Sequence, residues 1–265
     1  MNAGEAIAAA GLEPREARLL LAAASGFSET SLVAYPEREL PIRVLEKFRS
    51  MAERRRRGEP VAYLLGRKEF YGLELAVSPA VLIPRPETEL LVQLALERKP
   101  ATVLELGTGS GAVAVAIKRH LPKARVVAVE ASAAALEVAQ RNGAALGLEI
   151  DFRRGRWLEP AAGERFELIV SNPPYVAERD PHLRDLAYEP REALVSGADG
   201  LSAIREITRE APRHLQPGAW LLLEHGQGQD GAVRALLSAA GLESVVSWPD
   251  LAGIARVSGG RLKSD

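Results

Sequence analysis

Residues Thr102–Gly111 read TVLELGTGSG, and the apolar run Ala112–Ile117 follows them directly. An apolar stretch that ends in closely spaced glycines and continues into a second apolar run is typical of a strand, a glycine loop and a helix. Glycines at 107, 109 and 111 let the backbone approach a ligand at the N-terminus of that helix, as nucleotide-binding loops require. Two other interpretations stay open: a tight turn without a ligand and, because Ala112 completes the pattern G-x-G-x-x-A, a nicotinamide or flavin site.

A carboxylate ends the next predicted strand. Glu130 follows the run Arg125–Val129, about twenty residues after the glycines, which is the spacing expected of a ribose-binding acid. It can accept hydrogen bonds from both ribose hydroxyls, although a solvated charge at a strand end would give the same sequence. Ser132 can then cap an alanine-rich helix over residues 133–146. Trp157, farther along, could flank an adenine ring or pack in the core.

A third strand end carries a polar and aromatic turn. Asn172-Pro173-Pro174-Tyr175 comes directly after the apolar run Phe166–Ser171. Both prolines lack an N–H and hold φ at about −65°, so the turn is stiff and its carbonyls point outward. The Asn172 side chain and the Pro173 carbonyl can then accept both hydrogens of one NH2 group. That group could be the amide of glutamine or asparagine, or the exocyclic amine of adenine or cytosine, with Tyr175 stacking on it or simply packing.

These motifs follow the order of successive strands in a doubly wound α/β sheet, so they should converge at its carboxyl edge. Together, Glu105–Gly111 and Asn172–Tyr175 resemble the class I S-adenosylmethionine methyltransferases that act on amide or exocyclic amine nitrogens. Dinucleotide-binding enzymes lack the second motif. The resemblance implies S-adenosyl-L-methionine as methyl donor and S-adenosyl-L-homocysteine as product. The predicted cofactor-binding residues are Gly107, Thr108, Gly109, Ser110, Gly111, Glu130, Trp157 and Asn172, and the predicted catalytic and substrate-binding residues are Asn172, Pro173, Pro174 and Tyr175.

Further segments are similar to the HemK/PrmC family, the peptide chain release factor glutamine methyltransferases. They are Pro60–Gly66, Glu69–Gly72, Val81–Glu89, Glu189–Leu194 and Gly197–Leu201. The resemblance covers nearly the whole chain. It implies methylation of the side-chain nitrogen (N5) of the glutamine in the Gly-Gly-Gln motif of bacterial release factors, a step in translation termination. The family commonly has Gly-Asp-Trp where this chain has Arg156 before Trp157, which puts one adenine contact in doubt.

Three alternatives share part of this pattern. A relative that methylates a ribosomal-protein glutamine would carry the same motifs, and an adenine or cytosine methyltransferase could use the same clamp for an NH2 group. From a different class, a non-catalytic cofactor-binding factor on the ribosome would have no use for Asn172–Tyr175.

The composition of the chain limits which classes of protein it can belong to. The 265 residues have a formal net charge of −1 and 47% hydrophobic content, which argues for a globular protein and against a dedicated DNA-binding enzyme. No apolar run approaches the ~18 residues of a membrane span, and the first residues lack the basic start of a signal peptide, so we expect a cytoplasmic protein. We also expect a monomer. The chain has no cysteine and four histidines without metal-ligand spacing, which predicts no metal site. Asparagine occurs only at positions 2, 142 and 172, and this scarcity suggests a thermophilic source.

We expect three parts along the chain. Residues 1–59 should form a helical bundle, with helices opened by Pro14, by Ser28 or Thr30, and by Pro41; the resemblance implies that it docks the substrate protein. Residues 60–84 should be a linker with a short β-hairpin around 70–73, and residues 85–265 the methyltransferase domain, whose Rossmann-like, seven-stranded sheet ends in an antiparallel strand. The run Arg54–Arg57 reads either as a solvated helix end or as a docking surface.

Overall fold

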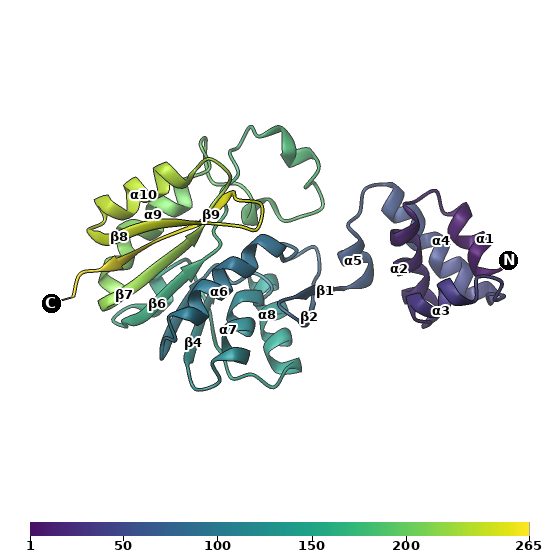
Figure 1. The fold of residues 1–265 in the computed structure, drawn as a ribbon, viewed down its shortest axis with the longest axis horizontal. Helices are drawn as coiled ribbons and strands as arrows, with labels where there is room; N and C mark the ends of the chain where they lie inside the picture. Colours follow the sequence, from purple (N-terminus) through teal and green to yellow (C-terminus); the bar gives the residue numbers. More distant parts are fainter. Residues whose placement is uncertain (265) are drawn as a thin grey trace. The chain divides into compact units, whose positions relative to one another are not determined.

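The computed structural model describes residues 1–264 and divides into two compact units, Met1–Arg67 and a larger unit that begins at Lys68 (Figure 1). The first unit extends past residue 59, the expected end of the helical bundle, because a further short helix belongs to it. No helix among the described residues combines the length and the apolar character needed to cross a bilayer.

The first unit consists of helices. They are α1 (Ala3–Ala9), α2 (Pro14–Ser25), α3 (Glu29–Ala34), α4 (Ile42–Arg56) and α5 (Val61–Leu65). Ser28, rather than Thr30, is the residue that caps α3, because its side chain accepts the N–H of Ser31 at 3.1 Å. Side chains from these helices enclose one apolar core around Leu20, Leu21 and Phe48.

The sequence did not predict α1, since a seven-residue segment that contains Gly4 gives only a weak helical pattern. A capping box fixes its start: Oδ1 of Asn2 accepts the N–H of Glu5 at 2.8 Å, and the Glu5 carboxylate accepts the N–H of Asn2 at 2.9 Å. Ala3 and Ala6 then pack into the core of the unit. Tertiary burial therefore holds a helix that local propensity alone would not.

The arginines at the end of α4 are bound within their own unit. The pairs are Arg54 with Glu59, Arg55 with Glu16, Arg57 with Glu53, and Arg56 with the carbonyl of Ala10. The pair of Arg57 and Glu53 contributes little free energy because both side chains are largely exposed, whereas Arg55 and Glu16 are each about 30% exposed. The pairing nevertheless offsets three of the four positive charges locally, which favours the helix-end interpretation of this run over the docking surface.

The second unit is built on a seven-stranded sheet with the strand order β5-β4-β3-β6-β7-β9-β8. The strands are β3 (Thr102–Leu106), β4 (Arg125–Glu130), β5 (Asp151–Arg154), β6 (Phe166–Ser171), β7 (Leu215–Glu224), β8 (Leu242–Pro249) and β9 (Ala255–Leu262). Strands β3 to β7 are parallel, and β9 runs antiparallel to both β7 and β8. This confirms the predicted Rossmann-like sheet with its antiparallel last strand. Strand β7 starts earlier than expected, at Leu215, since the residues around Pro217 are absorbed as a bulge opposite β6.

Helices cover both faces of this sheet (Figure 1). They are α6 (Glu89–Glu97), α7 (Ala112–His120), α8 (Ala133–Ala145), α9 (Ser202–Glu210) and α10 (Asp230–Ala239). Because side chains alternate along a strand, neighbouring residues serve different layers. Val103 and Leu168 belong to the layer with α6 and α7, whereas Leu104 and Ile169 belong to the layer with α9 and α10. Helix α8 lies beside α7.

The topology brings three strand ends together. Strand β3 lies inside the sheet; the chain adds β4 and β5 on one side of it and then returns to add β6 and β7 on the other. In register, Leu106 pairs with Val129 of β4 and with Ser171 of β6. The loops after these residues therefore open at the switch point of the sheet, which is where α/β proteins bind ligands.

A separate hairpin precedes the sheet. It consists of β1 (Arg67–Phe70) and β2 (Leu73–Ala76), joined by Tyr71 and Gly72. Both turn residues have positive φ, 52° and 73°, as the type I′ turn of a two-residue hairpin requires.

Candidate active site

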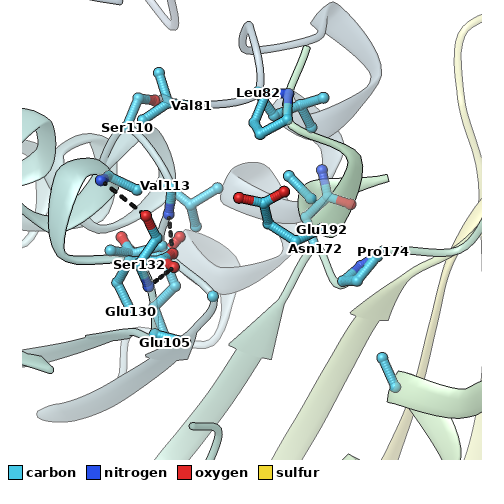
Figure 2. Close-up of a pocket in the computed structure, with 18 of the residues that line it drawn as sticks. Val81, Leu82, Glu105, Ser110, Val113, Glu130, Ser132, Asn172, Pro174 and Glu192 are labelled. Carbon is cyan, nitrogen blue, oxygen red and sulfur yellow. Dashed lines mark hydrogen bonds between the residues drawn. The ribbon is translucent and has the colours of Figure 1, made fainter. Parts of the chain in front are cut away.

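A cavity of about 480 Å³ opens at the carboxyl edge of the sheet, where the loops after β3, β4 and β6 meet. This volume suits a small-molecule ligand. Figure 2 shows Glu105, Glu130 and Ser132 on one side of the cavity and Asn172 with Pro174 on the other. The predicted site residues that line it are Gly107, Thr108, Gly109, Ser110, Glu130, Trp157, Asn172 and Pro174. Gly111, Pro173 and Tyr175 lie outside this lining.

The glycines of the loop have different tasks. Gly109 has a φ of +56°, and a Cβ built on it would meet no protein atom within 4 Å, so its backbone stays open to a ligand. At Gly111 the φ is +82°, and a Cβ would come within 3.1 Å of the Cβ of Ala139. Gly111 therefore allows α7 to begin close against α8, whereas Gly109 is the glycine suited to contact with a ligand.

One asparagine ties the glycine loop to its surroundings. The side chain of Asn142, on α8, is buried; its Nδ2 donates to the carbonyls of Ser110 at 2.8 Å and Ala76 at 3.0 Å. Its Oδ1 accepts the N–H of Ala76 at 2.7 Å. These bonds join the loop, α8 and strand β2, and the polar atoms are satisfied although they lie away from water.

Glu130 is held by backbone donors. Its Oε2 accepts the N–H of Gly109 at 2.9 Å, and its Oε1 accepts the N–H of Ser132 at 2.9 Å. A carboxylate offers about four acceptor positions, so each oxygen can accept one more hydrogen bond. The side chain is thus fixed at the end of β4 with remaining acceptor capacity toward the cavity that it lines.

A second carboxyl group, Glu105, lies under the glycine loop. Its Oε2 accepts the hydroxyl of Thr108 at 2.5 Å and the N–H of Ala114, in the first turn of α7, at 3.0 Å. Burial raises the pKa of Glu105 to about 8, and the negative charge of Glu130 adds to this, whereas the two hydrogen bonds act in the opposite direction. At neutral pH the group is therefore held largely as the neutral acid, next to a cavity wall.

Asn172 is oriented by a residue that is far away in the sequence. Its Nδ2 donates to Oγ1 of Thr88 at 3.1 Å, and Thr88 is buried at the start of α6. No group among residues 1–264 donates to Oδ1 of Asn172. The amide therefore keeps a free acceptor in the wall of the cavity.

The rest of the Asn-Pro-Pro-Tyr turn divides between the cavity and the core. Pro174 lines the cavity, whereas Pro173 is buried and is not among the lining residues. Tyr175 lies near Glu224, the last residue of β7; burial, and then the charge of Glu224, raise the pKa of its phenol above the ordinary value. The carbonyl of Tyr175 accepts a hydrogen bond from Nε2 of Gln229 at 3.0 Å. In this structure the ring contributes to packing behind the cavity rather than to its wall.

Trp157 both lines the cavity and packs on the core layer of α9 and α10. Its ring lies over the glycine loop, 3.3 Å from where a Cβ on Gly107 would be. Arg156, at the position where the family usually has Asp, forms a bidentate ion pair with Glu206 at 3.0 and 2.5 Å. The guanidinium is thereby drawn toward α9, so its charge is balanced locally although the residue also lines the cavity.

The rim of the cavity carries further charged groups. Arg85 forms an ion pair with Glu189, which is buried and also accepts the N–H of Ile83 at 3.1 Å. This ion pair joins Val81–Glu89 and Glu189–Leu194, two of the segments that resemble the HemK/PrmC family. Glu192 lines the cavity beside Asn172 (Figure 2). No set of three or more side chains within residues 1–264 is arranged to bind a metal.

Sequence reasoning did not select Thr88, Glu105, Glu192 or Glu224 as site residues. Glu224 had a usable signal, because it ends an apolar strand just as Glu130 does. Glu105 had a weaker one, an acidic residue inside an otherwise apolar strand. Thr88 had none, since its partner lies 84 residues away.

Comparison with known proteins assigns the chain to a family. Residues 2–66 match the family model "PrmC N-terminal domain", and residues 86–197 match "Methyltransferase small domain". A release factor glutamine methyltransferase from Xylella fastidiosa is 49% identical over 257 residues, which cover 94% of each chain.

Two solved structures share the fold. A methyltransferase from Pyrococcus furiosus aligns with a TM-score of 0.59 and 20% identity over 82% of this chain and 99% of that one. The 16S rRNA N2 G1207 methyltransferase of T. thermophilus, solved with AdoMet and guanosine, aligns with a TM-score of 0.55 and 20% identity over 74% of this chain and 50% of that one. The sequence match over nearly the full length confirms the resemblance: this chain belongs to the family of release factor glutamine methyltransferases.

Proposed function

We propose that this protein transfers a methyl group from S-adenosylmethionine to the side-chain amide nitrogen of the Gly-Gly-Gln glutamine in bacterial class I peptide chain release factors. The observation that carries the proposal is the position of Asn172. Its Oδ1 is a free acceptor in a cavity that is also lined by Glu130 and the glycine loop. One cavity can therefore hold both a nucleoside and an NH2 group.

The residues present fit the methyl donor. Gly109 leaves an open backbone surface, and Glu130 keeps acceptor capacity for ribose hydroxyls. Glu130 and Glu192 line the cavity, and the charges of Arg85 and Arg156 in the same lining are balanced by Glu189 and Glu206, so the walls favour a ligand with positive charge. S-adenosylmethionine is such a ligand, because its sulfur is positively charged and carries the electrophilic methyl group.

Asn172 and the turn after it would activate the amide. The lone pair of an amide nitrogen is delocalised into its carbonyl, so the nitrogen is a poor nucleophile. If Oδ1 of Asn172 and the carbonyl of Pro173 each accept one N–H, the lone pair can turn toward the methyl group. The stiff Pro173-Pro174 turn and the bond from Nδ2 to Thr88 hold these acceptors before the substrate arrives.

The reaction does not require a strong base in this arrangement. Alignment of two reactants can supply up to ~7–11 kcal/mol of the barrier. The amide proton can leave after methyl transfer, with Oδ1 of Asn172 as its hydrogen-bond acceptor and water as its destination. The charged groups at the rim then serve binding rather than proton abstraction.

The two units would divide the work. The helical bundle at residues 1–59 docks the substrate protein, residues 60–84 link it to the catalytic part, and residues 85–265 bind the donor and carry out the transfer. The matched N-terminal family model supports a separate role for the bundle. We further propose that the enzyme acts as a cytoplasmic monomer on a protein, without a nucleic-acid substrate or a metal.

Peptide mapping tests the proposal. The full-length chain is incubated with S-adenosylmethionine and a recombinant release factor, and the factor is digested and analysed by mass spectrometry. Addition of one methyl group to the Gly-Gly-Gln glutamine is expected, and it should be absent from a release factor with Gln→Ala in that motif. Methylation of a ribosomal protein or of nucleic acid, with an unmodified release factor, would refute the assignment.

A further inference from the structure

One carboxylate in the lining of the cavity has no partner in the protein. The acidic residues of the lining are Glu105, Glu130 and Glu192. Glu105 accepts hydrogen bonds from Thr108 and from the first turn of α7 and is held largely as the neutral acid, and Glu130 accepts two backbone N–H groups. Glu192 forms no hydrogen bond and no ion pair within residues 1–264. Figure 2 shows its carboxyl group pointing into the cavity beside Asn172, so a free carboxylate faces the space for a ligand.

Glu192 lies in a loop that is fixed on both sides. On one side, the buried Glu189 forms an ion pair with Arg85. On the other side, the carbonyl of Leu194 accepts the N–H of Val176 at 2.8 Å, and Val176 directly follows the Asn-Pro-Pro-Tyr turn. The backbone of Glu192 is therefore held beside this turn, although the side chain itself is exposed. A carboxylate that extends from a fixed position into a cavity is suited to bind a ligand rather than to stabilise the fold.

The methyl donor offers two positive groups to such a carboxylate. They are the sulfonium, which has no N–H or O–H group, and the ammonium group of the methionine part, which has three N–H donors. Hydrogen bonds between an ionised donor and a carboxylate are roughly twice as strong as those between neutral groups. The sulfur carries three substituents: with the ribose at Glu130 and the methyl group facing Asn172, the methionine part is the one left for Glu192. The ammonium group is therefore the better match.

The backbone acceptors of the glycine loop are already in use. The carbonyl of Thr108 accepts the N–H of Gly111 at 2.8 Å, and the carbonyl of Ser110 accepts Nδ2 of Asn142 at 2.8 Å. A neutral carbonyl also provides no charge to balance a cation, and a cation that leaves water without a counter-charge is costly. Glu192 supplies both vacant acceptor positions and the charge.

We propose that Glu192 binds the ammonium group of the methionine part of S-adenosylmethionine and thereby fixes the end of the donor that lies opposite the adenosine. The inference deepens the proposed function, but it rests only on the use of this donor and not on which amide is methylated. Glu192 is a donor-binding residue and takes no part in the methyl transfer itself. The product keeps the same ammonium group, so Glu192 should bind donor and product alike.

Three ligands separate the two positive charges of the donor. S-adenosylmethionine has both charges, S-adenosylhomocysteine has only the ammonium group, and 5′-methylthioadenosine has neither but keeps the adenine, the ribose and the sulfur. Calorimetric titration of the full-length chain gives each dissociation constant. Glu192→Gln should weaken binding of S-adenosylmethionine and of S-adenosylhomocysteine by about 5- to 20-fold each, as expected for one charge-assisted hydrogen bond at a partly solvated position. Binding of 5′-methylthioadenosine should change by less than about twofold.

A second variant and a matched control make the comparison sharper. Glu192→Lys places a positive charge against the ammonium group, so it should weaken the first two ligands more than Glu192→Gln does and still spare 5′-methylthioadenosine. Glu178 is an exposed residue of the same loop that does not line the cavity. Glu178→Gln removes the same charge from the loop and should leave all three affinities within about twofold of the wild type.

The pattern across the three ligands decides the proposal. Equal affinities of Glu192→Gln and the wild type for S-adenosylmethionine and S-adenosylhomocysteine would overturn it. A loss for S-adenosylmethionine alone would assign the carboxylate to the sulfonium and overturn it as well, and so would an equal loss for all three ligands, since that would indicate a general change of the cavity. If the wild-type chain binds the donor but methylates no release factor, the proposed function fails, and the affinities still decide the role of Glu192.

Discussion

The carboxylate of Glu130 and the backbone of Gly109 are joined by a hydrogen bond of 2.9 Å, although β4 and the glycine loop belong to different parts of the chain. The same carboxylate accepts the N–H of Ser132. The residue proposed to bind the ribose therefore also holds the loop proposed to bind the rest of the donor. Loss of its carboxylate should affect both.

Glu130→Ala should weaken binding of S-adenosylmethionine by roughly 10- to 1,000-fold. The ribose loses its acceptor, and the N–H groups of Gly109 and Ser132 lose theirs; each such bond to a charged group contributes about 1.5–3 kcal/mol. Calorimetric titration gives the dissociation constant. Glu137→Ala, at an exposed position on α8, is the control. Equal affinity in both variants would exclude a role for Glu130 in donor binding.

Asn172→Ala should retain donor binding and lose turnover by about 100- to 1,000-fold, the loss typical of one missing acceptor or donor at a reacting centre. Single-turnover methylation of the release factor measures the loss, and calorimetry checks that the donor still binds. Asn172→Asp keeps the shape of the side chain and an acceptor oxygen but cannot donate to Thr88, so it tests whether the bond to Thr88 is needed to orient residue 172. A variant with alanine at this position and full turnover would remove Asn172 from the mechanism.

The buried carboxyl of Glu105 should make stability depend on pH. Its pKa is near 4.5 in an unfolded chain and about 8 in the folded protein, so between these values the folded state holds a proton that the unfolded state has released. The contribution of this proton to the free energy of unfolding is fully present below pH 4.5 and is lost as the pH rises to about 8. The total change in the free energy of unfolding is on the order of 5 kcal/mol.

Glu105→Gln should flatten this part of the profile, because an amide does not titrate. Urea unfolding at pH 5 and pH 8 measures the difference between the variant and the wild type. Glu243→Gln, at an exposed position on β8, serves as control. An identical slope in wild type and Glu105→Gln would show that Glu105 does not hold the proton.

Asn142→Leu should destabilise the second unit by roughly 2–4 kcal/mol. The substitution keeps the branched shape of the side chain but leaves the carbonyls of Ser110 and Ala76 and the N–H of Ala76 without their partner. Chemical denaturation measures the loss, and saturating S-adenosylmethionine should restore part of it by mass action. Stability equal to the wild type would mean that water satisfies these groups.

Strands, strand ends and helix caps could be predicted from the sequence because they depend on residues that are close together in the chain. The apolar runs at 102–106, 125–129 and 166–171 are buried on both faces, so they read as parallel strands, and Glu130 and Asn172 stand out because each ends such a run. The short connection expected at Pro249–Gly253 is too brief for a parallel crossover, so it predicted the antiparallel final pair, and the structure confirms this pairing. The capped start of α8 at Ser132 followed in the same way.

Pairings between distant side chains were not predictable in this way. The partner of Asn172 is Thr88, which lies in a short 3-10 segment that no periodicity marks. Arg156 was recognised as a departure from the family pattern, but its pairing with Glu206 depends on how α9 packs on the sheet. Tyr175 was expected to stack or to pack, and its position near Glu224 follows from the register of β6 and β7.

Two acidic residues of the cavity lining also bear on how a catalytic cycle ends. Glu130 and Glu192 line the space proposed for the donor, whereas the buried Glu105 is held largely as the neutral acid. Methyl transfer removes the positive charge from the sulfur while the wall remains acidic, so attraction between ligand and wall decreases at the moment the product forms. This acidic lining should therefore favour fresh donor over spent donor, and it should limit product inhibition without any movement of the chain.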